Sequence, residues 1–240
     1  MRPCSCCSAC RSDRPRSPQI AALAVVVAAI VAGSAVAACP DCGTVAGSIA
    51  VEMATIRPDG PKHDRDVVVM LEPVGSAAPP ASGTRASMDQ TGLVFTPHVL
   101  AVQRGTTVTF LNSDKEQHNV YFLDDRTGAT LDIGTWGPGV SVDHTFDEPG
   151  VMITLCKLHL EMAAYVVVCP SPWFTAVQLD TGSSRARYEI PNVPAGTYEL
   201  AVWHKKLKQK GGKVRVEVAP GARIEVDIGI TKAQLAKSAD

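Results

Sequence analysis

Residues 156–162 read Cys-Lys-Leu-His-Leu-Glu-Met, and this short segment carries the strongest chemical signal in the chain. It places a thiol at Cys156, an imidazole at His159 and a thioether at Met162, directly after a strand-like apolar run at residues 150–155. Soft sulfur and nitrogen donors favour copper over magnesium, calcium or manganese. One loop leaving a strand can fold three such side chains around a single ion. The segment therefore predicts a soft-metal site at the end of a β-strand.

A trigonal copper site needs a second imidazole from elsewhere in the chain. The best candidate is His118, within the sequence Glu-Gln-His-Asn-Val-Tyr at residues 116–121. Two His and one Cys in a plane, with a weak axial Met, make a blue-copper electron-transfer site. Two other interpretations remain open. One is purely structural, with a buried Cys, a strand-end His and a core Met; the other is a Cys–His hydrolase, for which no oxyanion or orienting partner stands nearby.

The longer pattern around these residues, from Met88 to Cys169, resembles a cupredoxin. The Cys-x-x-His-x-x-Met loop is similar to that of amicyanin-type copper proteins, and His-Asn-Val at 118–120 is similar to the upstream ligand segment of plastocyanin-like domains. The overall pattern is similar to the bacterial family labelled methylamine utilization protein. Two positions depart from the common pattern: Leu158 stands where Pro is frequent, and Leu155 stands where an aromatic residue is frequent.

The resemblance implies one mononuclear type 1 copper site. Its ligands would be His118, Cys156, His159 and, axially, Met162. Asn119 would hydrogen-bond between the two ligand segments, and His159 would be the ligand nearest to solvent.

The expected fold class is all-β, a cupredoxin Greek-key β-sandwich plus a second small sandwich. Residues 188–204 contain a strand, a Pro-Gly turn and another strand, and they are similar to Ig-like, carboxypeptidase-regulatory-like domains. The opening of such domains also resembles residues 44–71. We therefore hypothesise that the segments before and after the cupredoxin domain form one sandwich, with the cupredoxin inserted between them. The expected division is opening strands at 44–74, a cupredoxin domain at 88–170, the second sandwich at 171–230 and a tail at 231–240.

Short apolar or alternating runs predict strands at 95–102, 106–111, 119–123, 140–146, 151–155 and 162–168. Residues 73–87 are rich in Gly, Ala, Ser and Pro, which predicts a linker. Gly and Pro at 134–139 predict a loop that contains Trp136. Strands at this spacing suit a sandwich of two sheets.

Residues 1–38 read as a basic segment, an apolar run and a small-residue end, which is the order of a secretory signal peptide. An uncleaved membrane anchor and lipidation at Cys39 are the alternatives. Export would place the remaining cysteines in an oxidising compartment. There Cys39 and Cys42 would form a small disulfide or a redox pair, and Cys169 would be a buried thiol or a partner of Cys42.

The chain has 240 residues with a formal net charge of −1, and removal of residues 1–38 leaves a small acidic excess. This charge gives no indication of nucleic-acid binding. We expect a periplasmic or otherwise extracytoplasmic electron carrier, an electron carrier rather than an enzyme, which meets redox protein partners transiently. The competing classes are a copper-delivery protein without redox cycling and a mononuclear copper enzyme with an open coordination position.

Overall fold

The computed structural model describes residue 39 and residues 41–52, 65–76, 79–80, 83–207 and 213–234. Regular structure in these ranges is almost entirely β-strand, with a 3₁₀ turn at Lys232–Gln234 (η2). The all-β prediction is confirmed. The expected signal peptide or anchor at residues 1–38 lies outside the described residues. Within the part of the chain that the structure describes, no helix has the length and apolar character needed to cross a membrane.

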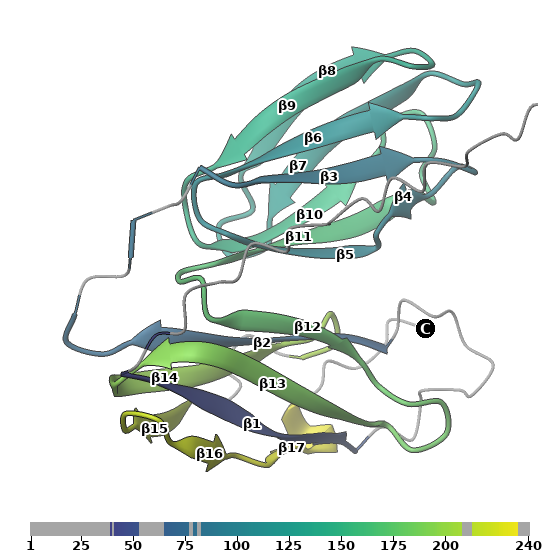
Figure 1. The fold of residues 1–240 in the computed structure, drawn as a ribbon. Helices are drawn as coiled ribbons and strands as arrows, with labels where there is room; N and C mark the ends of the chain where they lie inside the picture. The colour runs from purple at the N-terminus through teal and green to yellow at the C-terminus, as the bar shows by residue number, and fades with distance from the viewer. Residues whose placement is uncertain are drawn as a thin grey trace, which may run out of the picture. The chain divides into compact units, whose positions relative to one another are not determined.

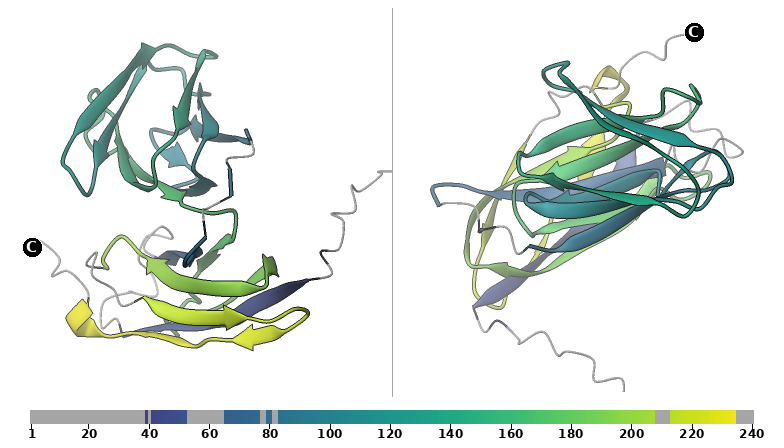
Figure 2. Two further views of the ribbon diagram at one scale, coloured as in Figure 1. Left: turned by 90° about the vertical axis from the view of Figure 1, so that its left-hand side faces the viewer. Right: turned by 90° about the horizontal axis from the view of Figure 1, so that it is seen from above.

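The strands between residues 85 and 169 form one two-layered sandwich (Figures 1 and 2). They are β3 (Arg85–Gln90), β4 (Phe95–Thr96), β5 (Val99–Gln103), β6 (Thr106–Asn112), β7 (His118–Asp124), β8 (Thr130–Trp136), β9 (Ser141–Phe146), β10 (Gly150–Leu155) and β11 (Ala163–Cys169). One sheet has the order β4-β3-β6-β9 and the other the order β5-β11-β10-β7-β8.

The core of this sandwich is built by alternation of apolar and polar residues along the strands. In β6, Val108 and Phe110 point inward between partly exposed Thr107 and Thr109. Phe110 packs against Phe122 of β7 at a ring-centroid distance of 5.5 Å. Because each fully buried side chain of this size contributes about 1.5–3 kcal/mol, this core fixes the strand register. Cys156 and Met162 belong to the same buried cluster.

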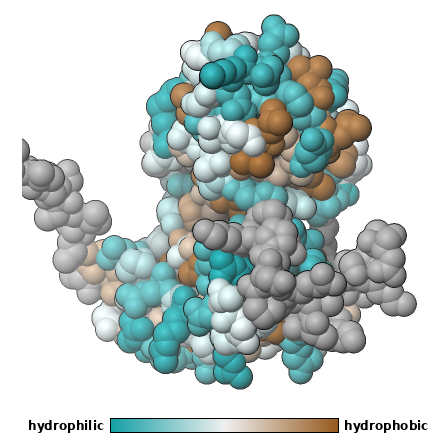
Figure 3. Space-filling model, turned by 90° about the vertical axis from the view of Figure 1, so that its right-hand side faces the viewer, coloured by the Kyte–Doolittle hydropathy of each residue, from teal (hydrophilic) through white to brown (hydrophobic). Residues whose placement is uncertain are grey.

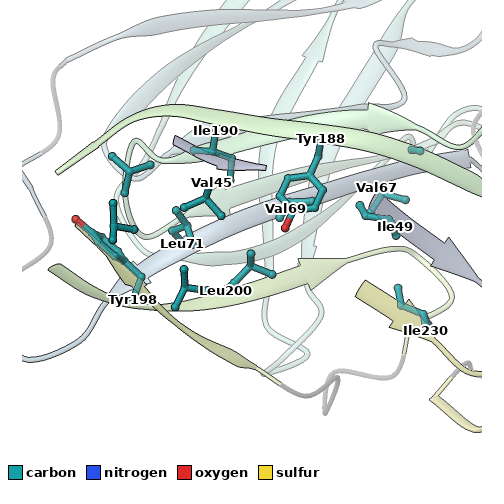
Figure 4. Packing of buried hydrophobic residues seen from close by; sticks show 14 of the residues in the cluster. Val45, Ile49, Val67, Val69, Leu71, Tyr188, Ile190, Tyr198, Leu200 and Ile230 are labelled. Carbon is teal, nitrogen blue, oxygen red and sulfur yellow. The ribbon is translucent and has the colours of Figure 1, made fainter. Parts of the chain in front are cut away.

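A second two-layered sandwich is built from strands on either side of the first in the sequence. These are β1 (Cys42–Val51), β2 (Asp66–Pro73), β12 (Phe174–Gln178), β13 (Arg185–Pro194), β14 (Gly196–Trp203), β15 (Val214–Val218), β16 (Arg223–Glu225) and β17 (Ile228–Ile230). One sheet has the order β13-β1-β16, with β17 also paired to β1, and the other has the order β12-β2-β14-β15. Figure 4 shows apolar side chains of both sheets, among them Val45, Leu71 and Tyr188, filling the space between them.

The pairings within this second sandwich join segments far apart in the sequence. β1 runs antiparallel to β13 from Cys42 to Ala50, and β2 runs antiparallel to β14. These are the contacts that the hypothesis of an inserted cupredoxin requires between residues 45–71 and 188–226. The likeness of this sandwich to carboxypeptidase-regulatory-like domains stays a prediction.

Three local expectations are wrong. The single strand expected at 95–102 is two strands, because β4 pairs with β3 in one sheet and β5 pairs with β11 in the other. Pro97 lies at the crossing, where it has no N–H to donate to either ladder. Trp136 ends strand β8 instead of lying in a loop, and β3 begins at Arg85, inside the expected linker and before the predicted boundary at 88. Both strands were missed because their exposed polar residues give no apolar alternation.

Among the described residues, the cysteines outside the predicted site fall into two kinds. Cys39 and Cys42 form a disulfide with a Cα–Cα distance of 5.2 Å. Cys169 is a free, fully buried thiol on β11, and burial raises its pKa far above the ordinary value. Pairing of Cys42 with Cys169, left open from the sequence, is therefore wrong. A thiol of this kind is inert apolar filling.

Candidate metal centre

Strand pairing brings the two predicted ligand segments together. His118 is the first residue of β7, and Cys156 directly follows the last residue of β10. β7 and β10 are antiparallel neighbours, with Leu155 opposite Tyr121, so the end of β10 lies beside the start of β7. His159 lies in the loop that leads from β10 to β11. The fold therefore places residues 118 and 156–159 at one end of the first sandwich.

Three donor atoms converge at that end. Nδ1 of His118 lies 3.1 Å from Nδ1 of His159, and Sγ of Cys156 lies 3.7 Å from Nδ1 of His159. The ligand atoms of the three residues all lie within 4.8 Å of one another. Two nitrogen donors bonded to one ion at about 2.1 Å lie at most about 4.2 Å apart, so the His–His separation suits joint coordination. Two imidazoles and one thiol are the donor set of a trigonal copper site, and the residues present fit copper.

The three side chains differ in exposure to solvent. His118 is fully buried and Cys156 is 2% exposed, whereas His159 is partly exposed. This order agrees with the expectation that His159 is the donor nearest to solvent. Exclusion of water from the thiol protects it from oxidation, which depends on access.

Asn119 ties the two ligand segments to each other. Its backbone N–H donates to Sγ of Cys156 at 3.4 Å, and its Oδ1 accepts from the backbone N–H of Lys157 at 3.4 Å. Its Nδ2 donates to the carbonyl of Gly134 at 2.8 Å and to Oδ1 of Asp132 at 2.9 Å. The hydrogen bonds lie where the resemblance implied them, and the effect of Asn119 on a loaded site stays a prediction.

Met162 is 1% exposed and packs in the same buried cluster as Cys156. Its backbone N–H donates to the carbonyl of His159 at 3.0 Å, which closes the turn that carries both residues. The thioether is thus held inside the sandwich, on the loop that carries the thiol. Its role as an axial ligand stays a prediction.

The sequence interpretation missed a carboxylate next to His118. Oδ2 of Asp114 lies 2.9 Å from Nε2 of His118, and the same carboxylate accepts from the backbone N–H groups of Gly92 at 2.6 Å and Leu93 at 3.0 Å. The Leu93 N–H is the main reason that the pKa of Asp114 lies below its ordinary value, and burial, the next largest effect, works against it. The spacing of four residues between Asp114 and His118 was the available signal. Its meaning depends on the turn at Gly92–Leu93, which is remote in sequence.

A second carboxylate was missed as well. Asp132 on β8 accepts from Nζ of Lys157 at 2.6 Å through Oδ2 and from Asn119 through Oδ1. The Lys157 ammonium, followed by the Asn119 amide, lowers the pKa of Asp132 to about 2. Asp132 therefore anchors the ligand loop to β8 through the residue that follows Cys156.

A family match covers the segment that carries this geometry. Residues 83–169 match the family described as copper binding proteins, plastocyanin/azurin family. Among solved structures, the chain is similar to a purple cupredoxin from Nitrosopumilus maritimus, with 26% identity over 35% of this chain and 98% of that chain and a TM-score of 0.32. It is also similar to a Cu(I) form of an amicyanin variant, with 25% identity over 42% of this chain and 97% of that chain and a TM-score of 0.33.

A copper-containing nitrite reductase from Thermus scotoductus SA-01 is similar at 25% identity over 40% of this chain, with a TM-score of 0.34, and the match covers 25% of the reductase chain. The assignment of this segment to a family rests on the family match and on the donor geometry, because both concern residues 83–169. Residues 83–169 therefore form a cupredoxin domain, and the cluster of His118, Cys156 and His159 supports a copper site in it.

Proposed function

We propose that this protein is an exported single-electron carrier that meets redox protein partners transiently. The observation that carries the proposal is the convergence of His118, Cys156 and His159, with the Asn119 N–H directed at the Cys156 sulfur. Copper bound by these residues supplies a reversible one-electron couple.

The chain supports such a role by holding its donors in fixed positions. His118 is anchored by the β7 ladder, and Cys156 by the end of β10 and the hydrogen bond from Asn119. Donors that keep their positions in both oxidation states lower the reorganisation that electron transfer requires. The N–H group that Asn119 directs at sulfur withdraws electron density from the thiolate, and hydrogen bonding of this kind tunes the reduction potential.

Apolar side chains are exposed on both sides of His159, between Lys157 and Glu161. Leu158 is 52% exposed and Leu160 is 86% exposed, and Leu93 and Val94 are exposed in the turn that binds Asp114. Figure 3 looks onto the end of the first sandwich where β3 and β6 finish, and shows apolar side chains gathered there among polar ones. A small apolar surface beside a partly exposed donor suits the brief contacts of redox encounters, which use small interfaces.

Export is supported by the order of basic, apolar and small residues at 1–38 and by the disulfide between Cys39 and Cys42. Determination of the mature N-terminus in the host, together with the mass of the mature protein, tests this part. A start at residue 39 with unmodified sulfur supports cleavage, a lipid-modified Cys39 supports lipoprotein processing, and a start at residue 1 overturns cleavage.

The decisive experiment is copper loading of the mature protein, followed by optical and EPR spectra and a redox titration. An intense visible thiolate-to-copper band, a narrow copper hyperfine splitting and reversible one-electron titration are expected. Cys156→Ser must lose the band. A colourless protein that retains only Cu(I) would instead indicate copper delivery. A pale site whose spectrum changes with added small ligands would indicate a copper enzyme.

A further inference from the structure

We propose that Asp114 is a positioning residue of the copper site, which fixes the imidazole of His118 in one tautomer and favours the Cu(II) state through its negative charge. The inference rests on the proposed function, because it concerns the potential of the same site. It depends on contacts that no sequence motif revealed.

The hydrogen bond between Asp114 and His118 has one possible direction. A carboxylate can only accept, so the 2.9 Å contact requires that Nε2 of His118 carries the proton. A neutral imidazole has one N–H, which leaves Nδ1 with a free lone pair. Nδ1 is the atom that lies 3.1 Å from Nδ1 of His159, inside the donor cluster. Asp114 thus selects the tautomer in which His118 can bind a metal through the correct nitrogen.

Hydrogen bonds from neighbouring backbone groups hold Asp114 in place. Its carboxylate accepts from the N–H groups of Gly92 and Leu93, and its own N–H donates to Oδ1 of Asn112 at 3.0 Å. Nδ2 of Asn112 in turn donates to the carbonyls of Glu116 and Trp136. The side chain of Asp114 is 15% exposed and that of His118 is fully buried. The carboxylate therefore keeps its orientation when the site gains or loses a metal.

The negative charge of Asp114 would also act on the metal through the imidazole of His118. A negative charge one hydrogen bond from an imidazole ligand raises the basicity of that ligand. It also stabilises a doubly charged ion more than a singly charged one, by Coulomb's law in a site with little water. Asp132, a second carboxylate that contacts the ligand segments, reaches them through Asn119 and Lys157. Asp114 is thus the carboxylate whose removal should change the potential most among the described residues.

Two variants separate charge from hydrogen bonding. Asp114→Asn keeps an oxygen that accepts from Nε2–H and removes the charge, whereas Asp114→Ala removes both. Asp143→Asn is the matched control, because Asp143 is an exposed carboxylate of β9 bonded to Thr109 and Arg85, away from the ligand segments. The readouts are the reduction potential and the separate affinities for Cu(II) and Cu(I).

We expect Asp114→Asn to lower the ratio of Cu(II) to Cu(I) affinity about tenfold, which raises the potential by about 59 mV for one electron. Asp114→Ala should lose a further 10- to 100-fold in metal affinity, as is typical when the partner of a ligating His is removed. Asp143→Asn should match the wild type. An unchanged potential in Asp114→Asn, with an intact thiolate band, overturns the inference.

A measurement on the wild type keeps the inference testable if the Asp114 variants do not fold. NMR of the imidazole nitrogens in the metal-free protein at neutral pH should show His118 protonated at Nε2, and protonation at Nδ1 overturns the tautomer assignment. The two proposals fail separately. If the wild type lacks the thiolate-to-copper band, the electron-carrier proposal is wrong. If the wild type has the band but the Asp114 variants have the same reduction potential as the wild type, only the role of Asp114 is wrong.

Discussion

The backbone N–H of Asn119 donates to Sγ of Cys156 across 3.4 Å, from the residue that directly follows His118. One ligand segment thus donates a hydrogen bond to the sulfur of the other. Because proline is the one ordinary residue that lacks a backbone N–H, other substitutions of Asn119 keep this donor, and the contact depends on the pairing of β7 with β10. Changes that leave this pairing intact should leave the hydrogen bond to the Cys156 sulfur in place.

Replacement of Met162 by Leu tests the axial position. Leu conserves the volume, so the loss of stability should stay below about 1.5 kcal/mol. The potential should rise, because Cu(II) loses a thioether donor that stabilises it. Met88→Leu is the matched control, since Met88 is fully buried in the same cluster and belongs to β3. Redox titration and chemical denaturation of both variants provide the measurement, and equal potentials in the two would exclude Met162 as a ligand.

Replacement of Leu160 by Glu tests the apolar surface. Electron self-exchange between Cu(I) and Cu(II) copies needs no identified partner, and NMR line broadening measures it. Two copies that meet through this surface would bring two carboxylates together, so the exchange rate should fall about tenfold or more. Leu131→Glu is the control, because Leu131 is also exposed but lies at the end of β8 away from Trp136 and His118. If self-exchange slows equally in both variants, the two copies do not meet through the surface around Leu160.

The pKa of Asp132 predicts a specific acid sensitivity. Its pKa of about 2 in the folded protein lies below the ordinary value of about 3.9, so its contacts with Lys157 and Asn119 stabilise the fold above about pH 4. This contribution is lost as the pH falls from about 4 towards 2. Urea denaturation at pH 6 and pH 2.5 should show a smaller loss of stability in Asp132→Asn than in the wild type.

Lys157→Met should reduce the same acid sensitivity, because the Lys157 ammonium is the main cause of the lowered pKa of Asp132. If both variants lose as much stability on acidification as the wild type does, the acid sensitivity does not come from the contact between Asp132 and Lys157. Asp132 is 41% exposed, so solvent screens the ion pair and we expect a modest effect.

Gly47 tests the second sandwich independently of the copper site. A Cβ at this position would overlap the carbonyl oxygen of Val226, and the Val226 N–H donates to the carbonyl of Ala46 at 2.8 Å. Gly47→Ala should therefore destabilise this sandwich by about 3 kcal/mol, the upper end of ordinary overpacking. Gly229→Ala is the control, since a Cβ there meets nothing within 4 Å. Thermal unfolding measures the loss, and the thiolate-to-copper band should not change in either variant.

The sequence was most informative where the chemistry is local. Cys156, His159 and Met162 lie within one loop, and their spacing alone indicated a soft-metal site. His118 was found because a copper site of this type needs a second imidazole. Asp114 and Asp132 were missed because their partners, the Gly92–Leu93 turn and Lys157, lie in other segments of the chain. A carboxylate acquires such a role only when the sheet register brings those segments together.

The same reasoning applies to the fold. β6 was recognisable because one face of the strand is apolar. β3 and β8 carry polar residues at most exposed positions, so their sequences do not reveal which backbone groups pair. Pairing of β1 with β13 was inferred from the likeness of residues 44–71 and 188–204 to one known domain, since no periodicity connects strands so distant in sequence.

Placement of β1 between β13 and the strands β16 and β17 also has a consequence for the order of events during synthesis. A ribosome finishes β3 to β11 long before it reaches residue 228, whereas β1 must wait for the last strands of the chain to find all of its neighbours. The cupredoxin domain can therefore fold first, while β1 gains its last neighbour only after residues 228–230 have been made. Of the described strands, β1 is synthesised first and is among the last to gain all of its neighbours.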